Sequence, residues 1–199
     1  MKICAIVGSS MAGGNTDSLT DAFLRGAAEY GHTAVKFCLG QTHVEPCLGC
    51  NACREKHICV QKDDFSQIVA AFTDCDIVVL ATPIYFWGMS AQLKAVIDRM
   101  YSLGEKDPRG YFKYPYKHCV LLATAADTDR HFWVFESLIQ YYERLTNYLR
   151  WTNLGILAIG SCGGTVVPRR IGETSNIEKG YEFGKQIGRR MAEEIERRP

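Results

Sequence analysis

The sequence has no excess of charge of either sign and no long hydrophobic run. Its 23 Lys and Arg residues face 22 Asp and Glu residues, so the formal net charge is +1. This balance gives no electrostatic basis for binding nucleic acid or an anionic membrane surface. No apolar run reaches the roughly 18 residues of a membrane span. The first apolar run, in MKICAIVGSS, ends at Gly8 without the features of a signal peptide. We therefore expect neither nucleic acid nor a membrane as a partner.

The composition also lacks the marks of disorder and of a disulfide framework. Hydrophobic residues make up 47% and charged residues 23% of the 199 residues, as in an ordinary globular protein. Without a linker, repeat or low-complexity tract, we expect a single domain over residues 1–199, with a cysteine-rich insert at about 41–62. The nine cysteines are an odd number, and five of them are scattered through apolar stretches, as expected of reduced thiols in the cytoplasm: Cys4, Cys38, Cys75, Cys119 and Cys162.

Apolar runs and helical stripes alternate along the chain. Five runs have the apolar pattern of buried strands, at residues 2–9, 32–39, 76–83, 118–125 and 154–161. Apolar residues at helical spacing follow each of the runs, with Asp63, Asp64 and Ser90 suited to helix N-termini and one helix expected over about 131–149. The alternation predicts an α/β fold, a three-layer sandwich with a five-stranded parallel sheet. The insert at 104–118 is expected to be a packed loop, over a site or at a subunit contact.

The turn after the first strand, GSSMAGGNTDSL (8–19), lacks the groups that bind larger nucleotides. It has no Gly-Lys-Ser/Thr ending and no G-x-G-x-x-G spacing, and the second strand ends in FCLG, without an acidic residue for a ribose. Hydroxyl and amide side chains remain beside a helix N-terminus, where an anion is favoured: Ser9, Ser10, Asn15, Thr16 and Ser18. The turn predicts a site for one phosphate monoester, such as that of FMN. The alternative is that Asn15 or Thr16 only caps the first helix.

A second turn, in ATPIYFWGMSAQLK (81–94), places Tyr85, Phe86 and Trp87 at the end of the third strand. Neighbouring side chains diverge, so these three cannot all reach the core. In a sheet of order 2-1-3-4-5, the ends of the first and third strands flank the topological switch point, where ligands bind. A phosphate turn beside an aromatic turn predicts a flavin site. An oligomer contact is the alternative use of the aromatic residues, and both uses can coexist.

GSSMAGGNTDSL together with PIYFWGMSAQLKAVIDR resembles the NAD(P)H-dependent FMN reductase group of flavodoxin-like proteins. The intervening PCLGCNACREKHICVQKDD (46–64) narrows the resemblance to the iron–sulfur flavoproteins and their cysteine-bearing relatives. The motifs cover residues 2–101, and the remainder matches only in element order. The resemblance implies a flavodoxin-like fold, one FMN per subunit, and a homodimer or homotetramer with the site near a subunit interface. The FMN-binding residues that it implies are Ser9, Met11, Asn15 and Thr16 at the phosphate, Pro83, Ile84, Tyr85, Phe86 and Trp87 along the ring and ribityl chain, and Thr124 and Ala125 in a third loop.

The chain departs from the family pattern in two places. Where the family loop often reads Ser-Pro-Arg, this chain has Ser9-Ser10-Met11, which leaves the phosphate to neutral donors. The third loop, TAADTDRH, is distinctive to this chain. Its charged residues are alternatively caps of the following helix: Asp127, Asp129, Arg130 and His131.

Four cysteines, Cys47, Cys50, Cys53 and Cys59, follow one another with the spacing C-x2-C-x2-C-x5-C. A reducing compartment disfavours disulfides, and structural zinc sites usually pair two knuckles across a longer spacer. Three thiolates at three-residue intervals let a short loop wrap three corners of a cubane, and Cys59 would supply the fourth. The spacing favours a [4Fe–4S] cluster, as the family resemblance also does. Zinc and unligated thiols are the alternatives.

Together these patterns predict an FMN-dependent oxidoreductase. No Ser–His–Asp or Cys–His hydrolytic pattern is evident, and no catalytic side chain is assigned, because FMN itself carries the chemistry. With a cluster, electrons would pass between a ferredoxin or NAD(P)H and a small acceptor such as a quinone or an oxygen species. Without one, NAD(P)H is the expected donor of a flavin, quinone or nitro/azo-type reductase. A non-enzymatic flavodoxin-like electron carrier and a cysteine-based redox or metal sensor are the other classes left open.

Overall fold

The computed structural model describes residues 1–106, 112–113, 116–127, 133–162 and 176–197. Five strands form a sheet of order β2-β1-β3-β6-β7, and every neighbouring pair is parallel. The predicted order 2-1-3-4-5 is confirmed, since β6 and β7 are the fourth and fifth strands of this sheet. The strands are β1 (Lys2–Val7), β2 (Thr33–Cys38), β3 (Ile77–Pro83), β6 (His118–Thr124) and β7 (Thr152–Ile159).

The central strands are apolar because both faces of the sheet are covered. In β1 every residue after Lys2 is buried, and in β3 every residue before Pro83 is buried. The register places Ile6 beside Leu80, and Leu80 beside Leu121. A continuous apolar run, instead of an alternating one, is what a parallel strand buried on both faces requires.

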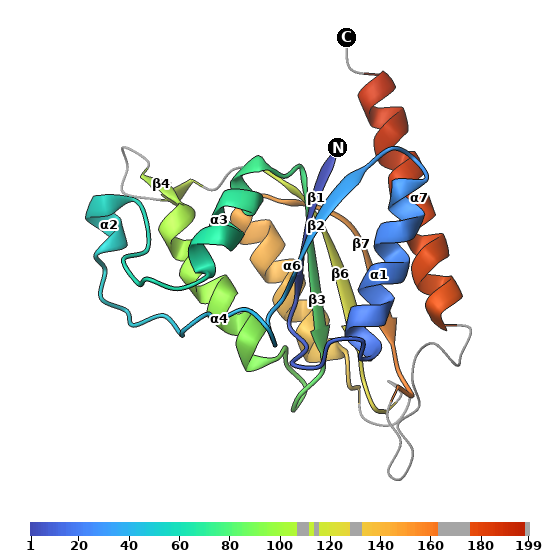
Figure 1. The fold of residues 1–199 in the computed structure, drawn as a ribbon, viewed down its shortest axis with the longest axis horizontal. Helices are drawn as coiled ribbons and strands as arrows, with labels where there is room; N and C mark the ends of the chain where they lie inside the picture. Colours follow the sequence, from blue (N-terminus) through green and yellow to red (C-terminus); the bar gives the residue numbers. More distant parts are fainter. Residues whose placement is uncertain (107–111, 114–115, 128–132, 163–175, 198–199) are drawn as a thin grey trace.

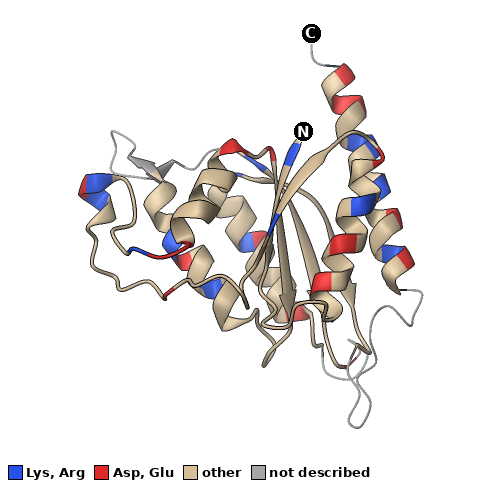
Figure 2. Cartoon of the chain, in the orientation of Figure 1, with Lys and Arg blue, Asp and Glu red and all other residues tan. Residues whose placement is uncertain are grey.

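Helices cover the two faces of the sheet unequally (Figure 1). On one face lie α1 (Asn15–Ala28) and α7 (Asn176–Glu196), and on the other lie α3 (Phe65–Asp74), α4 (Ala91–Arg99) and α6 (Glu136–Leu149). Charged residues of both signs lie along the helices, with few on the strands (Figure 2). No helix within the described ranges combines the length and apolar character of a membrane span.

Glycine brings α1 and α7 into close contact. A Cβ atom added to Gly26 would collide with the carbonyl oxygen of Tyr181, and one added to Gly184 would collide with that of Phe23. The two helices therefore pack backbone against backbone, and side chains larger than hydrogen are excluded at these crossings.

Two apolar clusters, one on each face, form the core. The cluster under α3, α4 and α6 includes Phe72, Tyr142 and Trp151, and the Phe72 and Trp151 rings lie 5.5 Å apart between centroids. The cluster under α1 and α7 includes Phe23 and Met191. Burial of such large apolar side chains is the main stabilising term of a fold of this size.

Of the sequence-based expectations about element boundaries, one at Ser90 is confirmed and others differ from the structure. Ser90 is the expected N-cap of α4, and its hydroxyl accepts from the N–H of Leu93 at 3.3 Å. The insert at 104–118 was expected to be only a loop, but β4 (Glu105–Lys106) pairs with β5 (Phe112–Lys113) there, and strands this short leave no periodic signal. Two short helices were also not predicted: α2 (Cys53–Lys56) and the 3₁₀ helix η1 (Met100–Leu103).

Candidate functional site

The first loop of the candidate site joins β1 to α1. The Gly8 N–H donates to the carbonyl of Ala81 at 2.7 Å, which ties the loop to β3. Ser9 is buried beneath the loop, and its hydroxyl accepts from the N–H of Met11 at 3.1 Å. Gly14 occupies the N-cap position of α1. The loop thus lies at the positive end of α1, where backbone N–H groups favour an anion.

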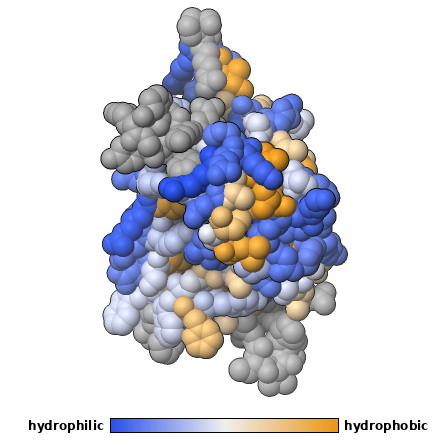
Figure 3. Space-filling view, turned by 90° about the vertical axis from the view of Figure 1, so that its left-hand side faces the viewer, coloured by the Kyte–Doolittle hydropathy of each residue, from blue (hydrophilic) through white to orange (hydrophobic). Residues whose placement is uncertain are grey.

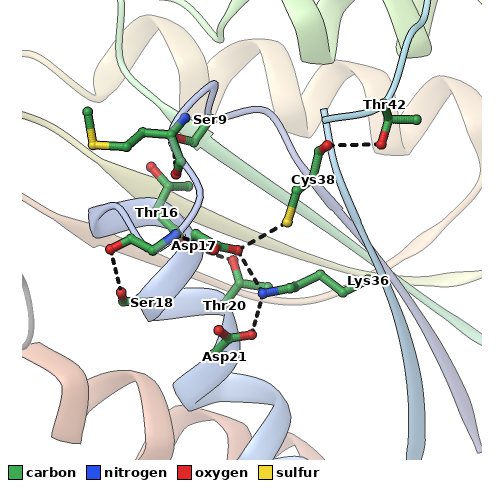
Figure 4. Close-up of polar contacts among 11 residues, drawn as sticks. Ser9, Thr16, Asp17, Ser18, Thr20, Asp21, Lys36, Cys38 and Thr42 are labelled. Atoms are coloured by element: carbon green, nitrogen blue, oxygen red, sulfur yellow. Dashed lines mark hydrogen bonds and ion pairs between the residues drawn. The ribbon is translucent and has the colours of Figure 1, made fainter. Parts of the chain in front are cut away.

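Asp17, in the first turn of α1, holds this loop from the helix side (Figure 4). Its carboxylate accepts from the N–H of Gly13 at 2.7 Å, from Lys36 Nζ at 2.8 Å and from Cys38 Sγ at 3.3 Å. Burial opposes ionisation, but Lys36 and Gly13 hold the pKa of Asp17 below its usual range. Because Lys36 compensates the carboxylate, Asp17 fixes the loop without adding an unpaired negative charge. Neither residue was predicted, since each reads as an ordinary charge on its own element.

The side chains of Asn15 and Thr16 bond to residues that are distant in sequence. Asn15 Nδ2 donates to the carbonyl of Cys162 at 2.5 Å, and Thr16 Oγ1 lies 2.7 Å from Thr124 Oγ1. The N-cap of α1 is Gly14, which makes no side-chain capping bond. Neither Asn15 nor Thr16 therefore caps the first helix; their side chains instead join the start of α1 to residues at the ends of β7 and β6.

The second loop follows β3 and reverses direction at Phe86 and Trp87. Tyr85 and Gly88 each donate an N–H to the carbonyl of the other at 3.0 Å, while φ is +47° at Phe86 and +62° at Trp87. Positive φ at both central positions is type I′ geometry, which asparagine and glycine prefer. Bulky residues in this geometry store local strain of the kind found at binding sites. Phe86 is 94% exposed, so the turn presents its aromatic side chains instead of burying them.

The third loop follows β6 and is bonded to its neighbours through the backbone. The carbonyl of Thr124 accepts from the N–H of Ile84 at 2.7 Å. Ala125 donates to the carbonyl of Ile159 and accepts from the N–H of Cys162, both at 2.9 Å. The three loops therefore meet at one edge of the sheet, as expected for the carboxyl ends of adjacent parallel strands.

A cavity of about 370 Å³ opens between the second and third loops. This volume lies within the roughly 300–1,000 Å³ of small-molecule sites, and the mostly apolar, aromatic lining suits a flat ring. The lining residues are Ile84, Phe86, Trp87, Ala125, Ala126, Asp127 and Val134.

The residues predicted to bind FMN lie in two groups around these loops. Four of them line the cavity: Ile84, Phe86, Trp87 and Ala125. The others do not line it and lie in the first and second loops, at the start of α1 or at the ends of β3 and β6: Ser9, Met11, Asn15, Thr16, Pro83, Tyr85 and Thr124.

Three lining residues were not predicted as binding residues. Asp127 was named only as an alternative helix cap, and Ala126 and Val134 carry no motif that would mark them. Of the other possible caps, Asp129, Arg130 and His131 lie outside the described residues.

The cysteine segment, defined here as residues 45–63, lies between β2 and α3. Just outside its ends, the N–H of His43 donates to the Asp64 carboxylate at 2.9 Å, and the N–H of Asp64 donates to the carbonyl of His43 at 3.0 Å. Figure 3 views the molecule from the α2 side and shows a hydrophobic patch surrounded by hydrophilic residues. The exposed apolar residues of the segment are Leu48, Ile58 and Val60.

All four cysteines of the segment line one cavity of about 50 Å³, several times the roughly 10–15 Å³ that one water requires. Every one is a free thiol; Cys47 and Cys50 are exposed, whereas Cys53 and Cys59 are half-buried. Burial raises the pKa of Cys53, and the other three thiols raise it further, as expected of sulfurs close to one another. The N–H of Gly49 donates to Cys47 Sγ at 3.5 Å. Among the described residues, no three His, Cys, Asp or Glu side chains are grouped closely enough to hold a metal ion.

The parallel sheet order defines a flavodoxin-like α/β protein, and its anion-favouring first loop and apolar cavity lie at the carboxyl ends of the strands, where such folds bind ligands. A family model described as NADPH-dependent FMN reductase matches residues 1–149. The chain belongs to this family of flavin-dependent oxidoreductases, which favours an enzyme over a non-enzymatic carrier or a sensor.

Individual proteins support this assignment. An iron–sulfur flavoprotein of Methanocaldococcus jannaschii is 29% identical over 199 residues, covering 98% of this chain and 97% of its own. A putative NAD(P)H-dependent FMN-containing oxidoreductase of Bacillus subtilis is 31% identical over 171 residues, covering 84% of this chain and 90% of its own. The solved NAD(P)H:quinone oxidoreductase of Methanothermobacter marburgensis superposes with a TM-score of 0.71 at 16% identity, covering 96% of this chain and 98% of its own, and shares the fold.

Proposed function

We propose that this FMN-dependent oxidoreductase is an iron–sulfur flavoprotein, with a [4Fe–4S] cluster at Cys47, Cys50, Cys53 and Cys59. The observation that carries the proposal is that all four thiols line one cavity, in a chain of the FMN reductase family. The cavity offers several times the space that one water requires, so it has room for more than one water. Thiolates are the ligands that such clusters take, and the N–H of Gly49 already donates to one of the sulfurs.

FMN is proposed to bind across the three loops, which together with their cavity we call the FMN crevice. Ser9, Met11, Asn15 and Thr16 would surround the phosphate at the N-terminus of α1, and Pro83, Ile84, Tyr85, Phe86 and Trp87, with Thr124 and Ala125, would follow the ring and ribityl chain. When bound, FMN supplies hydride and single-electron exchange. The loops would orient the bound FMN, and their apolar lining would limit the access of water to it.

Electrons would pass between NAD(P)H or a ferredoxin and a small acceptor such as a quinone or an oxygen species. Phe86 and Trp87, which line the crevice, are exposed, as is Trp133 beside the lining residue Val134. A second copy of the chain would cover these aromatic residues, so we propose a homodimer or homotetramer, and the free thiols of all nine cysteines support a cytoplasmic location. Light scattering of the purified protein measures the oligomeric state directly.

A cluster-free NAD(P)H-dependent FMN or quinone reductase is the second candidate. It is favoured by the sulfur arrangement, in which the thiols share a cavity without being grouped as a ready-made ion site. The Bacillus subtilis relative, whose name mentions FMN and NAD(P)H only, points in the same direction.

Anaerobic purification followed by an absorption spectrum and by iron and sulfide determination separates the two candidates. The iron–sulfur flavoprotein is expected to contain FMN and about four irons per chain. FMN without iron, in protein prepared and reconstituted anaerobically, would establish the cluster-free reductase instead. Protein without flavin would contradict both.

A further inference from the structure

Arg99, the last residue of α4, carries a positive charge into the interior. Its side chain is 0% exposed and that of Asp63 is 3% exposed. Arg99 Nη2 donates to Asp63 Oδ1 at 2.9 Å, and Nη1 donates to the other carboxylate oxygen. The guanidinium also lies over the Phe65 ring, with 4.3 Å between Cζ and the ring centroid. Because a buried charge must be paired and hydrogen-bonded, these contacts hold the guanidinium in one orientation.

The same ion pair joins the two ends of the cysteine segment. Arg99 Nη1 donates to the carbonyl of Glu45 at 3.1 Å. The Asp63 carboxylate accepts from the N–H of Glu45 at 2.9 Å and from the N–H of Phe65 at 3.2 Å. Glu45 and Asp63 are the two ends of the segment, so one guanidinium holds together the chain on both sides of the four cysteines.

Arg99 also lines the cavity that the four cysteines share. Its Nε is buried and has no hydrogen-bond partner among the described residues. Cys59 lines the same cavity as Arg99 and is the thiol that interacts with the guanidinium. Leaving a buried donor unsatisfied is costly, and an anionic sulfur at Cys59 would be the acceptor that this donor lacks.

We propose that Arg99 is a positioning residue for the iron–sulfur cluster, whose Nε–H donates to the sulfur of Cys59 and whose charge offsets that of the cluster. The inference rests on the proposed function, because it requires the cluster at the four cysteines. A [4Fe–4S] cluster with four thiolates is an anion, and its reduction adds one more negative charge. A buried cation stabilises the reduced form more than the oxidised form, so Arg99 raises the reduction potential. Asp63 orients Arg99 and partly cancels this effect.

The reduction potential of the cluster tests the inference. It is measured by an EPR-monitored redox titration of the anaerobically purified holoprotein, and the iron content of each preparation is determined alongside. Arg99→Met is expected to lower the potential, and Asp63→Asn is expected to raise it. Arg99→Lys should lower it by less than Arg99→Met, because lysine keeps the charge but lacks the Nε donor. The matched control Lys56→Met removes an exposed charge from the same segment, and it should leave the potential unchanged because solvent screens that charge.

The outcomes distinguish a failure of this inference from a failure of the proposed function. Wild-type protein without iron would contradict the proposed cluster itself. Equal potentials in wild type and Arg99→Met, at equal iron content, would overturn the role of Arg99. A shift in the same direction for Arg99→Met and Asp63→Asn, or an equal shift for Lys56→Met, would also overturn it. If Arg99→Met loses its iron, Arg99→Lys decides: a lowered potential supports the role and an unchanged one overturns it.

Discussion

The FMN crevice and the cysteine segment are held to the protein in different ways. The loops of the crevice are bonded to one another and to the sheet at many points, such as Ile84 to Thr124 and Gly8 to Ala81. The cysteine segment is anchored mainly at its ends, by Asp63, Asp64 and Arg99. The first site is therefore part of the scaffold, whereas the second is an insert whose geometry depends on a few side chains.

Because of this difference, we expect a substitution that removes the cofactor from one site to leave cofactor binding at the other unchanged. Cys53→Ser is expected to remove most of the iron and to leave FMN content unchanged, because Cys53 touches the cysteine cavity and not the crevice. Iron and flavin determinations on the same anaerobic preparation measure both. Cys38→Ser, at a cysteine outside the segment, is the matched control and should keep its iron. If Cys53→Ser lost FMN together with iron, FMN binding would depend on the cysteine segment, and the prediction would be wrong.

The crevice should in turn be weakened without effect on the cysteine segment. Thr124→Val removes the hydroxyl that joins Thr16 at 2.7 Å and leaves a buried hydroxyl without its partner. We expect FMN affinity to fall by up to about tenfold, the equivalent of roughly 1.4 kcal/mol. Fluorescence titration of apoprotein with FMN gives the affinity. Thr73→Val, which removes an exposed hydroxyl bonded to its own helix, should bind FMN as wild type does.

Stability near the first loop should depend on acid pH through Asp17. Its pKa is depressed in the folded protein, so its contribution is complete above its unfolded pKa of about 3.9 and is lost as the pH falls through the folded value. Asp17→Asn should lower the free energy of unfolding by about 1–3 kcal/mol at neutral pH. The difference from wild type should shrink below about pH 4.

Urea unfolding of both proteins between neutral and acid pH measures this difference. Asp21→Asn is the matched control, because Asp21 bonds to the same Lys36 from a half-exposed position and should cost less. If Asp17→Asn lowered the free energy of unfolding by the same amount down to acid pH, the charge of Asp17 would not be the cause of its stabilising effect.

The smallest effect is expected at the strained turn of the crevice. Phe86→Asn places a residue that tolerates positive φ where a phenylalanine is 94% exposed. The free energy of unfolding should stay equal or rise by up to about 1 kcal/mol, while FMN affinity falls because the ring loses an aromatic contact. A variant that loses stability would show that the turn is not strained.

The sequence predicts the sheet and part of the crevice because their signals are local. Buried runs identify the five strands, and the aromatic turn and the hydroxyl-rich turn identify two of the three loops. Arg99 could not be predicted in this way. It ends an amphipathic helix, where an arginine is normally solvent-exposed, and its partner Asp63 reads as part of a helix N-terminus. Asp127 and Val134 were missed for a similar reason, since only the folded chain brings them to the cavity.

The ion pair between Arg99 and Asp63 affects how readily the cysteine segment could be replaced by another. Because Glu45 and Asp63 meet at Arg99, the distance between the two ends does not depend on what lies between them. Doubling the length of a closed loop costs only about 0.6 kcal/mol. The sheet would therefore accept a longer, shorter or cysteine-free replacement between these two residues. The segment is in this sense an exchangeable module, and a chimaera carrying a foreign segment would keep the same flavin-binding framework.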